Sequence, residues 1–399
     1  MDKKAANRWV LLLFAMICML IMGVCYTYSL FNPYVQEHFG VDQATATLPY
    51  TIFIAVFVIG NYLGGISTTK NGMKKTLVIG YVLMFLGWLI TSFLPSNLFW
   101  GMIVTFGGLF GIGDGMVYNV IVALTPKWFP DRKGLASGLT LAALGLSATI
   151  FSPMVSGWLQ NYGFRPSFMI VAFIYVGVAI IGLLTLKNPP EGYMVQTAAG
   201  GGPANAVAPQ KQYEVKEAVK MKEFWVVMAL YFCAVPAYLL MSAIFVSYGK
   251  SKGLAPAMAT LGVSIASLCQ VGGRLVLPTI SDKIGRKNAF IVSFLVTAAG
   301  IAILLFATGP LYVACFALLS LSYGGCNACF GPIAADIWGT KNLGTILSLT
   351  MIGFGVGSIA STILNKVLGP STAFIVAGVI AVIGVALVFM LPSKKKENP

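Results

Sequence analysis

Apolar runs of roughly 20 residues or more recur twelve times along the sequence. An α-helix needs about that length to cross the hydrocarbon core of a bilayer. The chain has 399 residues, of which 58% are hydrophobic and 10% charged, and a soluble core of this size could not absorb so much apolar sequence. We therefore expect an all-α integral membrane protein with twelve transmembrane helices, at Trp9–Phe31, Ala44–Ile66, Thr76–Phe93, Leu98–Leu124, Gly134–Trp158, Ser167–Leu186, Phe224–Tyr248, Ala257–Ser281, Ala289–Ala307, Pro310–Ile337, Leu343–Leu364 and Thr372–Leu391.

The longest connection between apolar runs divides the chain into two halves. It contains Pro189-Pro190 and a Gly-Gly-Gly-Pro stretch at 200–203, followed by alternating charges. Such a segment cannot bury a core and is typical of a flexible linker. We predict an N-terminal six-helix bundle at residues 1–187, a cytoplasmic linker at 188–222 and a C-terminal six-helix bundle at 223–399.

Two loops of the first half have counterparts in the second. The stretch Gly65–Lys74, between the second and third spans, answers Pro278–Lys287, between the eighth and ninth. The stretch Trp128–Gly134 answers Trp338–Gly344 with a constant offset of 210 residues. Two equivalent loops in register indicate duplication, so the two bundles should be pseudo-symmetric.

The distribution of basic residues predicts the orientation in the membrane. Of the 26 Lys and Arg residues, twenty-one fall in the connections on one side and four on the other, and Arg274 remains inside a span. By the positive-inside rule both termini are cytoplasmic, and we expect a multi-pass plasma membrane protein, in a bacterium the inner membrane. The basic residues form short clusters between apolar runs, so the net charge of +14 does not indicate nucleic-acid binding.

The loop after the eighth span carries a family motif. It reads Asp282-Lys283-Ile284-Gly285-Arg286-Lys287. The motif resembles the loop signature of the major facilitator superfamily, Gly-x-x-x-Asp-Arg/Lys-x-Gly-Arg-Arg/Lys, with Pro278 in place of the first glycine. The equivalent loop of the first half, Gly65–Lys74, departs further from the signature. It has Thr69 in place of the aspartate and Met73 in place of an arginine. The resemblance implies a cytoplasmic gate, in which Asp282, Lys283, Gly285 and Arg286 hold helices together in one conformation.

A narrower resemblance covers nearly the whole chain. It rests on Asn7-Arg8-Trp9, on Gly23–Phe31, on Trp128-Phe129-Pro130-Asp131 with the following residues to Gly138, and on Gly273-Arg274. These stretches resemble the oxalate/formate antiporter family and the related monocarboxylate transporters. The resemblance implies transport of a small carboxylate anion, with Arg274 pairing the substrate carboxylate.

Two departures from these families bear on the substrate. Oxalate-exchanging relatives carry a second cation in the eleventh span, where this chain has Thr350. One buried cation suits one carboxylate, because a dianion would leave a charge uncompensated. Monocarboxylate transporters carry an aspartate four residues before the arginine, where this chain has Gln270. Gln270 can hydrogen-bond Arg274 or substrate, but it cannot carry a proton.

Asp114 is the one carboxylate deep inside a predicted span. At 1.5 Å per residue, Asp114 and Arg274 both lie about 25 Å from the outer ends of their spans, so a direct or water-mediated pairing is possible. We predict Asp114 as the proton-coupling candidate. The alternative is a carboxylate that is hydrogen-bonded locally among Gly111, Gly113 and Gly115.

Further pocket residues follow from helix faces. Tyr118 and Asn119 could donate to a carboxylate, and Tyr26 and Tyr28 are expected at the end of the first span. Tyr323 and Asn327 form a polar pair at i and i+4 in the tenth span. Each also fits an ordinary packing or interfacial role. The predicted substrate-binding set is Arg274, Tyr118, Asn119, Tyr28, Gln270, Tyr323, Asn327 and Phe354, the last as an apolar wall.

The sequence offers no machinery for catalysis. It has no Ser/His/Asp set and no ATP-binding motif, and Cys326-x-x-Cys329 lacks the further ligands of a metal site. We expect no enzyme activity, cofactor or metal, and a monomer in the lipid bilayer. The predicted function is proton-coupled symport of a small monocarboxylate such as lactate or pyruvate by alternating access. Carboxylate exchange of the oxalate/formate type is the alternative, and a transport-dead membrane sensor is an alternative of a different class.

Overall fold

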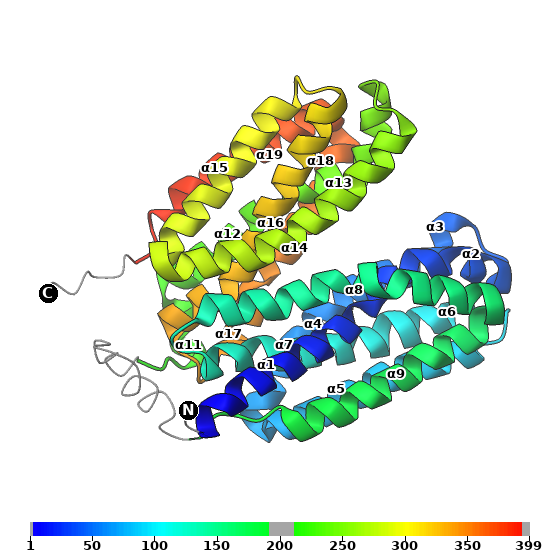
Figure 1. Cartoon of the computed structure of the whole chain (residues 1–399), viewed down its shortest axis with the longest axis horizontal. Helices are drawn as coiled ribbons and strands as arrows, with labels where there is room; N and C mark the ends of the chain where they lie inside the picture. The colour runs from blue at the N-terminus through cyan, green and yellow to red at the C-terminus, as the bar shows by residue number, and fades with distance from the viewer. Residues whose placement is uncertain (1–2, 191–210, 393–399) are drawn as a thin grey trace, which may run out of the picture. The chain divides into compact units, whose positions relative to one another are not determined.

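The computed structural model describes residues 3–190 and 211–392, and every regular element in these ranges is a helix (Figure 1). Twelve helical segments of the described ranges are long and apolar enough to cross a membrane, which confirms the predicted all-α class. Before the gap the helices are α1 (Lys3–Met22), a 3₁₀ turn (Gly23–Thr27), α2 (Tyr28–Phe39), α3 (Gln43–Ala46), α4 (Leu48–Asn71), α5 (Met73–Phe93), α6 (Phe99–Met102), a π-helical segment (Ile103–Phe110), α7 (Gly111–Trp128), α8 (Lys133–Tyr162) and α9 (Phe164–Thr185). After it come α11 (Val215–Lys220), α12 (Lys222–Ala234), α13 (Pro236–Ser251), α14 (Pro256–Ile284), α15 (Arg286–Leu304), α16 (Gly309–Trp338), α17 (Leu343–Thr350), α18 (Ile352–Leu368) and α19 (Pro370–Val388).

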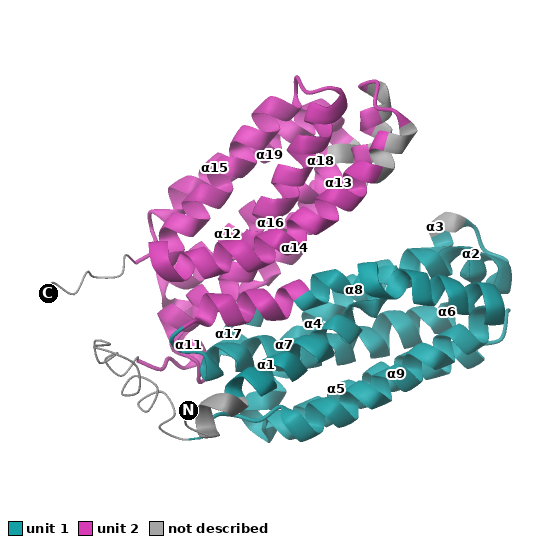
Figure 2. Cartoon of the chain, viewed as in Figure 1, with its two compact units in different colours: residues 1–131, 143–210, 342–348 teal, residues 132–142, 211–341, 349–399 magenta. Residues whose placement is uncertain are grey.

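The chain divides into two compact units, coloured separately in Figure 2. Each unit consists mainly of one half of the sequence. Two short segments cross this division: Arg132–Ala142, at the start of α8, counts with unit 2, and Asn342–Ser348, in α17, counts with unit 1. Both segments lie at the duplicated loops identified in the sequence. The bundle boundaries at 187 and 223 stay a prediction.

The predicted linker ends in a short helix. Its residues 191–210 lie outside the described ranges, and α11 follows them. The Glu217 side chain accepts a hydrogen bond from the Glu214 backbone N–H at 3.0 Å, which satisfies a donor at the helix start. Glu214 also pairs with Lys341 at 2.7 Å, and this hydrogen bond raises the pKa of the Lys341 ammonium. The end of the predicted linker is therefore ordered against the loop between α16 and α17.

Unit 1 is built on close helix packing and an aromatic core. α4 lies against α7, and α5 lies against α7 and α9. A Cβ atom at Gly115 would overlap the Phe57 carbonyl oxygen, so the α4–α7 approach requires glycine there. Trp88, Phe106 and Tyr175 are fully buried and contact one another or shared aromatic neighbours. These aromatic contacts fill the interior of unit 1, where the described residues form no ion pair.

The first span is longer than predicted. It continues from α1 through α2 to Phe39 rather than ending at Phe31, and α2 ends where Gly40 adopts a positive φ of 65°. The helix does not end at the polar residues that follow Phe31. They continue it, because valine and phenylalanine at positions 35 and 39 keep a buried face at helical spacing. The expected placement of Tyr28 at the end of the span is therefore wrong.

Two spans of the second half of the chain are interrupted, whereas its helices α14 and α16 are long and continuous. The seventh span breaks at Pro236 into α12 and α13, and the eleventh breaks at Met351 into α17 and α18. Proline cannot donate the backbone hydrogen bond of a helix interior, which explains the first break. α14 runs unbroken and packs against α16 more extensively than any other pair of helices.

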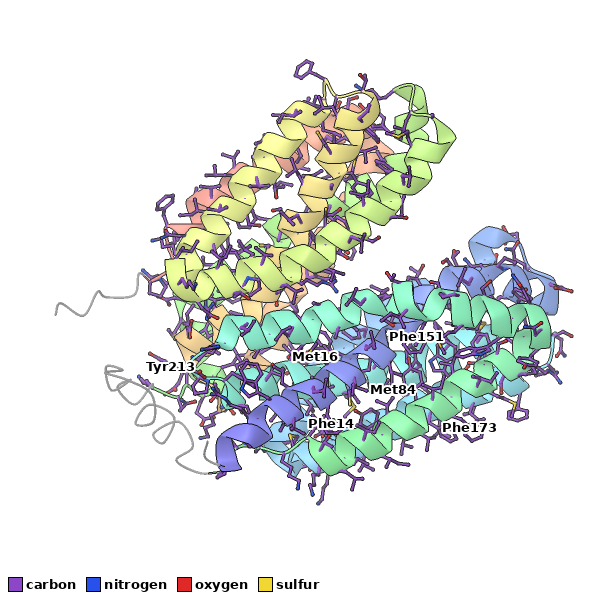
Figure 3. All side chains as sticks on the ribbon, viewed as in Figure 1. Phe14, Met16, Met84, Phe151, Phe173 and Tyr213 are labelled. Carbon is purple, nitrogen blue, oxygen red and sulfur yellow. The ribbon has the colours of Figure 1, made fainter. Side chains whose placement is uncertain are left out.

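Large apolar side chains cover the outside of the helices. In unit 1 Met84 is fully buried, whereas Phe173 on α9 is 57% exposed and points outward from its helix (Figure 3). A soluble protein rarely exposes so many large apolar side chains, but a bilayer solvates them. The exposed apolar faces are consistent with a multi-pass membrane protein.

Candidate functional site

Glycines bring α14 and α16 into close contact around Arg274. A Cβ atom at Gly273 would overlap the carbonyl oxygen of Leu321, and one at Gly324 would overlap that of Gln270. Glycine at these positions lets the two backbones approach. The turn of α14 that carries Gln270 and Arg274 therefore lies against the turn of α16 that carries Tyr323.

Arg274 lies near the middle of the membrane-spanning part of α14 and is half-buried. Its Nη1 donates a hydrogen bond to the Leu141 carbonyl oxygen at 3.0 Å. Among the described residues of unit 2, no carboxylate forms an ion pair with Arg274. One backbone carbonyl does not neutralise a guanidinium at membrane depth, so the charge of Arg274 favours an anionic ligand.

Tyr238 joins the predicted residues in this site. It lies on the first turn of α13, just after the break at Pro236, and its ring stacks on Tyr323 with centroids 4.1 Å apart and planes 15° apart. Its side chain also lies near Gln270 and Arg274. Sequence reasoning missed Tyr238 because a tyrosine in an apolar run has no distinguishing neighbours, although Pro236 is a signal of irregular backbone.

The other predicted residues of unit 2 occupy different settings. Asn327 donates its amide hydrogen to the Tyr323 carbonyl oxygen at 3.0 Å, within α16. Phe354 is half-buried on α18, beside Gly353, which packs against the Met228 carbonyl oxygen of α12. Their roles as substrate contacts stay predictions.

Tyr28 is held inside unit 1. It is 2% exposed, and its hydroxyl donates to the Ala46 carbonyl oxygen at 2.9 Å. Its ring stacks on Tyr50 and packs against Phe106. The hydroxyl hydrogen is therefore engaged in the fold.

Asn119 is also engaged within unit 1. Its amide nitrogen donates to the Asn61 side chain at 2.6 Å and to the Gly344 carbonyl oxygen at 2.8 Å. Both amide hydrogens are thus used, so Asn119 has none left for a substrate in this arrangement. Tyr118, the next predicted residue, is half-buried and meets Phe57 edge to face at 5.2 Å.

Asp114 is buried in the interior of unit 1. It is 4% exposed and lies on the first turn of α7, directly after the π-helical segment. Cys25, Tyr81 and Tyr175 are close to it, and its Oδ1 has no hydrogen-bond partner among the described residues. π-helical segments are frequent at functional sites. Because Asp114 belongs to unit 1 and Arg274 to unit 2, their pairing stays a prediction.

The predicted gate motif forms an ionic cluster within unit 2. Asp282 pairs with Arg286 at 2.5 Å, and Arg286 also pairs with Asp336 at 3.1 Å. Lys133 pairs with Asp336 at 2.7 Å. Asp282 further accepts hydrogen bonds from the first backbone N–H groups of α8, those of Gly134 at 3.0 Å and the next residue at 3.1 Å. A carboxylate at a helix N-terminus is favoured by the helix dipole.

The two copies of the motif differ in chemistry but share backbone geometry. Gly285 and Gly72 turn the chain with φ of +89° and +85°, a conformation that L side chains rarely adopt. Lys283 is exposed. Thr69 donates its hydroxyl hydrogen to the Gly65 carbonyl oxygen of its own helix at 3.0 Å. The first copy thus lacks the carboxylate that caps α8 in the second, and the gating role of the motif stays a prediction.

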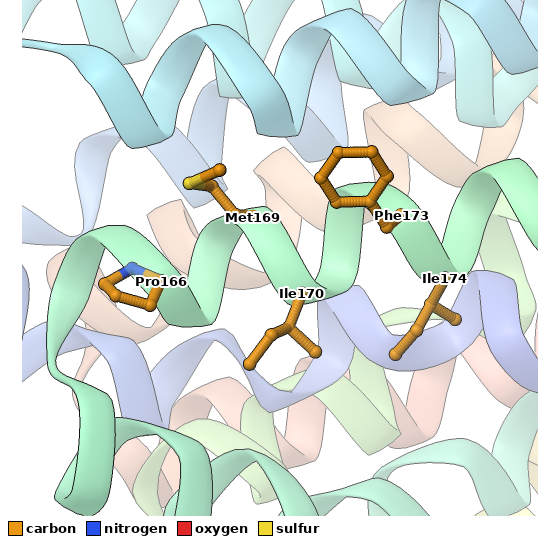
Figure 4. Close-up of a pocket in the computed structure, with 5 residues that line it drawn as sticks. All are labelled: Pro166, Met169, Ile170, Phe173 and Ile174. Atoms are coloured by element: carbon orange, nitrogen blue, oxygen red, sulfur yellow. The ribbon is translucent and has the colours of Figure 1, made fainter.

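A surface hollow on α9 does not suit an anion. Its lining residues, Pro166, Met169, Ile170, Phe173 and Ile174, all come from this one helix (Figure 4). All five are apolar, so the hollow offers no donor to a carboxylate. It fits a lipid-facing surface better than a substrate site.

Known proteins resemble this chain over its whole length. The sequence profile of the Major Facilitator Superfamily matches residues 11–353 and 237–399. The oxalate:formate antiporter of Oxalobacter formigenes is 30% identical, with 97% of this chain and 92% of that protein covered. Monocarboxylate transporter 13 of Rattus norvegicus is 24% identical, with 94% and 86% covered.

Solved structures share the fold at lower identity. The fucose transporter FucP, in an outward conformation, superimposes with a TM-score of 0.71 at 15% identity, covering 95% of this chain and 99% of that one. The proton:xylose symporter XylE superimposes with a TM-score of 0.72 at 13% identity, covering 97% and 96%. Together with the twelve membrane-length helices and the loop motif, these matches show that the chain belongs to the Major Facilitator Superfamily of transporters.

Proposed function

We propose that this transporter carries a small monocarboxylate, such as lactate or pyruvate, together with a proton by alternating access. The observation that carries the proposal is Arg274, a half-buried cation in the middle of α14 that donates a hydrogen bond to a backbone carbonyl oxygen. A substrate carboxylate would supply the missing anion and lower the cost of keeping the guanidinium at membrane depth.

The residues at two positions that are charged in related transporters favour one negative charge on the substrate. Thr350, where oxalate-exchanging relatives carry a second cation, is fully buried and neutral. Gln270, one turn before Arg274, is neutral as well. Relatives include both an oxalate:formate antiporter and monocarboxylate transporters, so the charge of the site supports the second kind of substrate.

Asp114 is the proposed proton site. A carboxyl group with an unpartnered oxygen inside an aromatic core is much cheaper to bury as a neutral acid than as an anion. A proton that binds and leaves Asp114 would thus change the energy of unit 1 during the cycle. This supports Asp114 as the group that couples proton movement to transport. The neighbouring glycines Gly111, Gly113 and Gly115 serve close helix packing.

The first test concerns Arg274. Arg274→Ala should abolish saturable uptake of labelled lactate into vesicles containing the purified protein. Arg165→Ala is the matched control, because Arg165 is an exposed arginine at the start of α9, and uptake should persist. Near-normal lactate uptake by Arg274→Ala would refute the assignment.

The second test concerns the energy source. Uptake of lactate, formate and oxalate should be measured with and without an imposed proton gradient, and with each acid preloaded inside the vesicles. Stimulation by the proton gradient alone supports symport, whereas dependence on internal carboxylate supports exchange. Failure to accumulate any carboxylate under either condition would favour the sensor alternative.

The third test concerns Asp114. Asp114→Asn should remove the response of uptake to the proton gradient, with Asp42→Asn as a control at an exposed helix cap. Proton-driven accumulation that remains intact in Asp114→Asn would sink the assignment of the proton site.

A further inference from the structure

Tyr238 lies where a side chain could contact the part of the substrate beyond its carboxylate. Its ring is fixed by the face-to-face stack on Tyr323 and by Phe316, whose ring centroid is 6.2 Å away. The residue is half-buried, with its ring packed against these neighbours. Aromatic packing thus sets the direction of the hydroxyl group.

The surroundings of the hydroxyl group are polar and lie beside the anion site. The side chains that interact with Tyr238 include those of Ser242 and Gln270, through hydrogen bonds, and that of Arg274, through its charge. Among the described contacts, one of the five guanidinium donors of Arg274 is used, by the Leu141 carbonyl. A carboxylate bound to the remaining donors would bring its second carbon near the phenol and the Gln270 amide.

We propose that Tyr238 is a specificity-determining residue, whose hydroxyl group hydrogen-bonds the oxygen on the second carbon of a 2-hydroxy or 2-oxo monocarboxylate held by Arg274. This inference rests on the proposed function and deepens it. A plain alkanoate has no atom to pair with the phenol, so binding it forfeits the hydrogen bond that a 2-hydroxy or 2-oxo acid would make. Sites built to hydrogen-bond a substrate hydroxyl reject analogues that lack it.

The test compares lactate with propionate, which differs from it only by the missing hydroxyl group. Uptake of both labelled acids is measured in vesicles with the full-length protein. The unaltered protein should prefer lactate in kcat/KM. Tyr238→Phe keeps the ring and its stack, so it should lower the lactate-to-propionate ratio about tenfold or more by impairing lactate, with propionate uptake nearly unchanged. Retained propionate uptake also shows that the variant is folded.

Tyr248→Phe is the matched control. It removes a hydroxyl group from the same helix, one that bonds Ser371 at 3.1 Å, and the ratio should stay as in the unaltered protein. An unchanged ratio in Tyr238→Phe, or an equal loss of both acids, would overturn the inference but leave the proposed function standing. Absence of Arg274-dependent uptake of either acid by the unaltered protein would instead overturn the proposed function, and this inference with it.

Discussion

At the scale of single residues, the surroundings of a hydroxyl group decide what it can do. Tyr28 and Tyr238 both lie in membrane-spanning helices and both stack on another tyrosine. The Tyr28 hydroxyl already donates to the Ala46 carbonyl oxygen in a buried setting. The Tyr238 side chain is half-buried beside Arg274. The first supports the fold, and the second is the hydroxyl group that we propose for the substrate contact.

Tyr28→Phe should therefore affect stability rather than transport. The change leaves the buried Ala46 carbonyl oxygen without this donor, and we expect a loss of about 0.5–1.5 kcal/mol in the free energy of unfolding. Thermal unfolding in detergent measures this loss, and the KM for lactate should stay near that of the unaltered protein. A raised KM with unchanged unfolding would show that Tyr28 contacts the substrate.

The sequence could reveal Arg274 but not Tyr238, for a physical reason. A cation inside an apolar span is expensive and therefore conspicuous in the sequence alone. A tyrosine is compatible with packing, with an interface and with a binding site, and only its neighbours distinguish these settings. The hydrogen-bond partners of Asn119, namely Asn61 and Gly344, are likewise far from it in the sequence. The sequence alone could therefore not predict that both amide hydrogens of Asn119 are used inside unit 1.

At the scale of helices, glycine controls how closely α14 and α16 approach. The hydropathy of the chain predicts that these helices exist, yet it does not show which faces meet. Gly273 and Gly324 occupy the points where a Cβ atom would overlap a carbonyl oxygen of the facing helix. The same contact holds the Arg274 turn against the Tyr323 turn, so helix packing and the proposed substrate site depend on the same pair of helix faces.

Gly273→Ala should separate the two helices and impair both stability and transport. Overpacking of this kind costs about 1–3 kcal/mol. Gly272→Ala is the matched control, since the nearest atom to its Cβ is a Leu321 methyl carbon at 3.9 Å, an ordinary contact. We expect lower thermal stability and slower lactate uptake for Gly273→Ala and nearly unchanged values for Gly272→Ala. Equal behaviour of the two variants would contradict the packing argument.

The duplicated loops show how the same backbone can use different chemistry. In unit 2 the start of α8 is bound by the carboxylate of Asp282. In unit 1 the start of α17 receives a hydrogen bond from the neutral amide of Asn119, and Gly65 packs against Thr345. The equivalent helix start in unit 1 is thus contacted through a backbone carbonyl oxygen, and not through a carboxylate that accepts from its N–H groups.

At the scale of the whole molecule, hydrophobic length was the most reliable signal. All twelve predicted spans correspond to membrane-length helical segments, because a bilayer imposes one minimum length on every helix that crosses it. The breaks at Pro236 and Met351 and the extension of the first span to Phe39 were not predicted. These features depend on local backbone geometry and on contacts with neighbouring helices, and a hydropathy profile carries no information about either.

The orientation of the molecule is predicted from charge, and two exposed side chains can test it. Lys341 lies between the tenth and eleventh spans, and Arg165 lies at the start of α9, after the fifth span. With both termini in the cytoplasm, Lys341 would face the cytoplasm and Arg165 the outside. In a chain whose partly exposed Cys269 is replaced by serine, Arg165→Cys should react with a membrane-impermeant maleimide on intact cells. Lys341→Cys should react only after permeabilisation, and the opposite pattern would reverse the orientation, because the excess of basic loops would then lie outside.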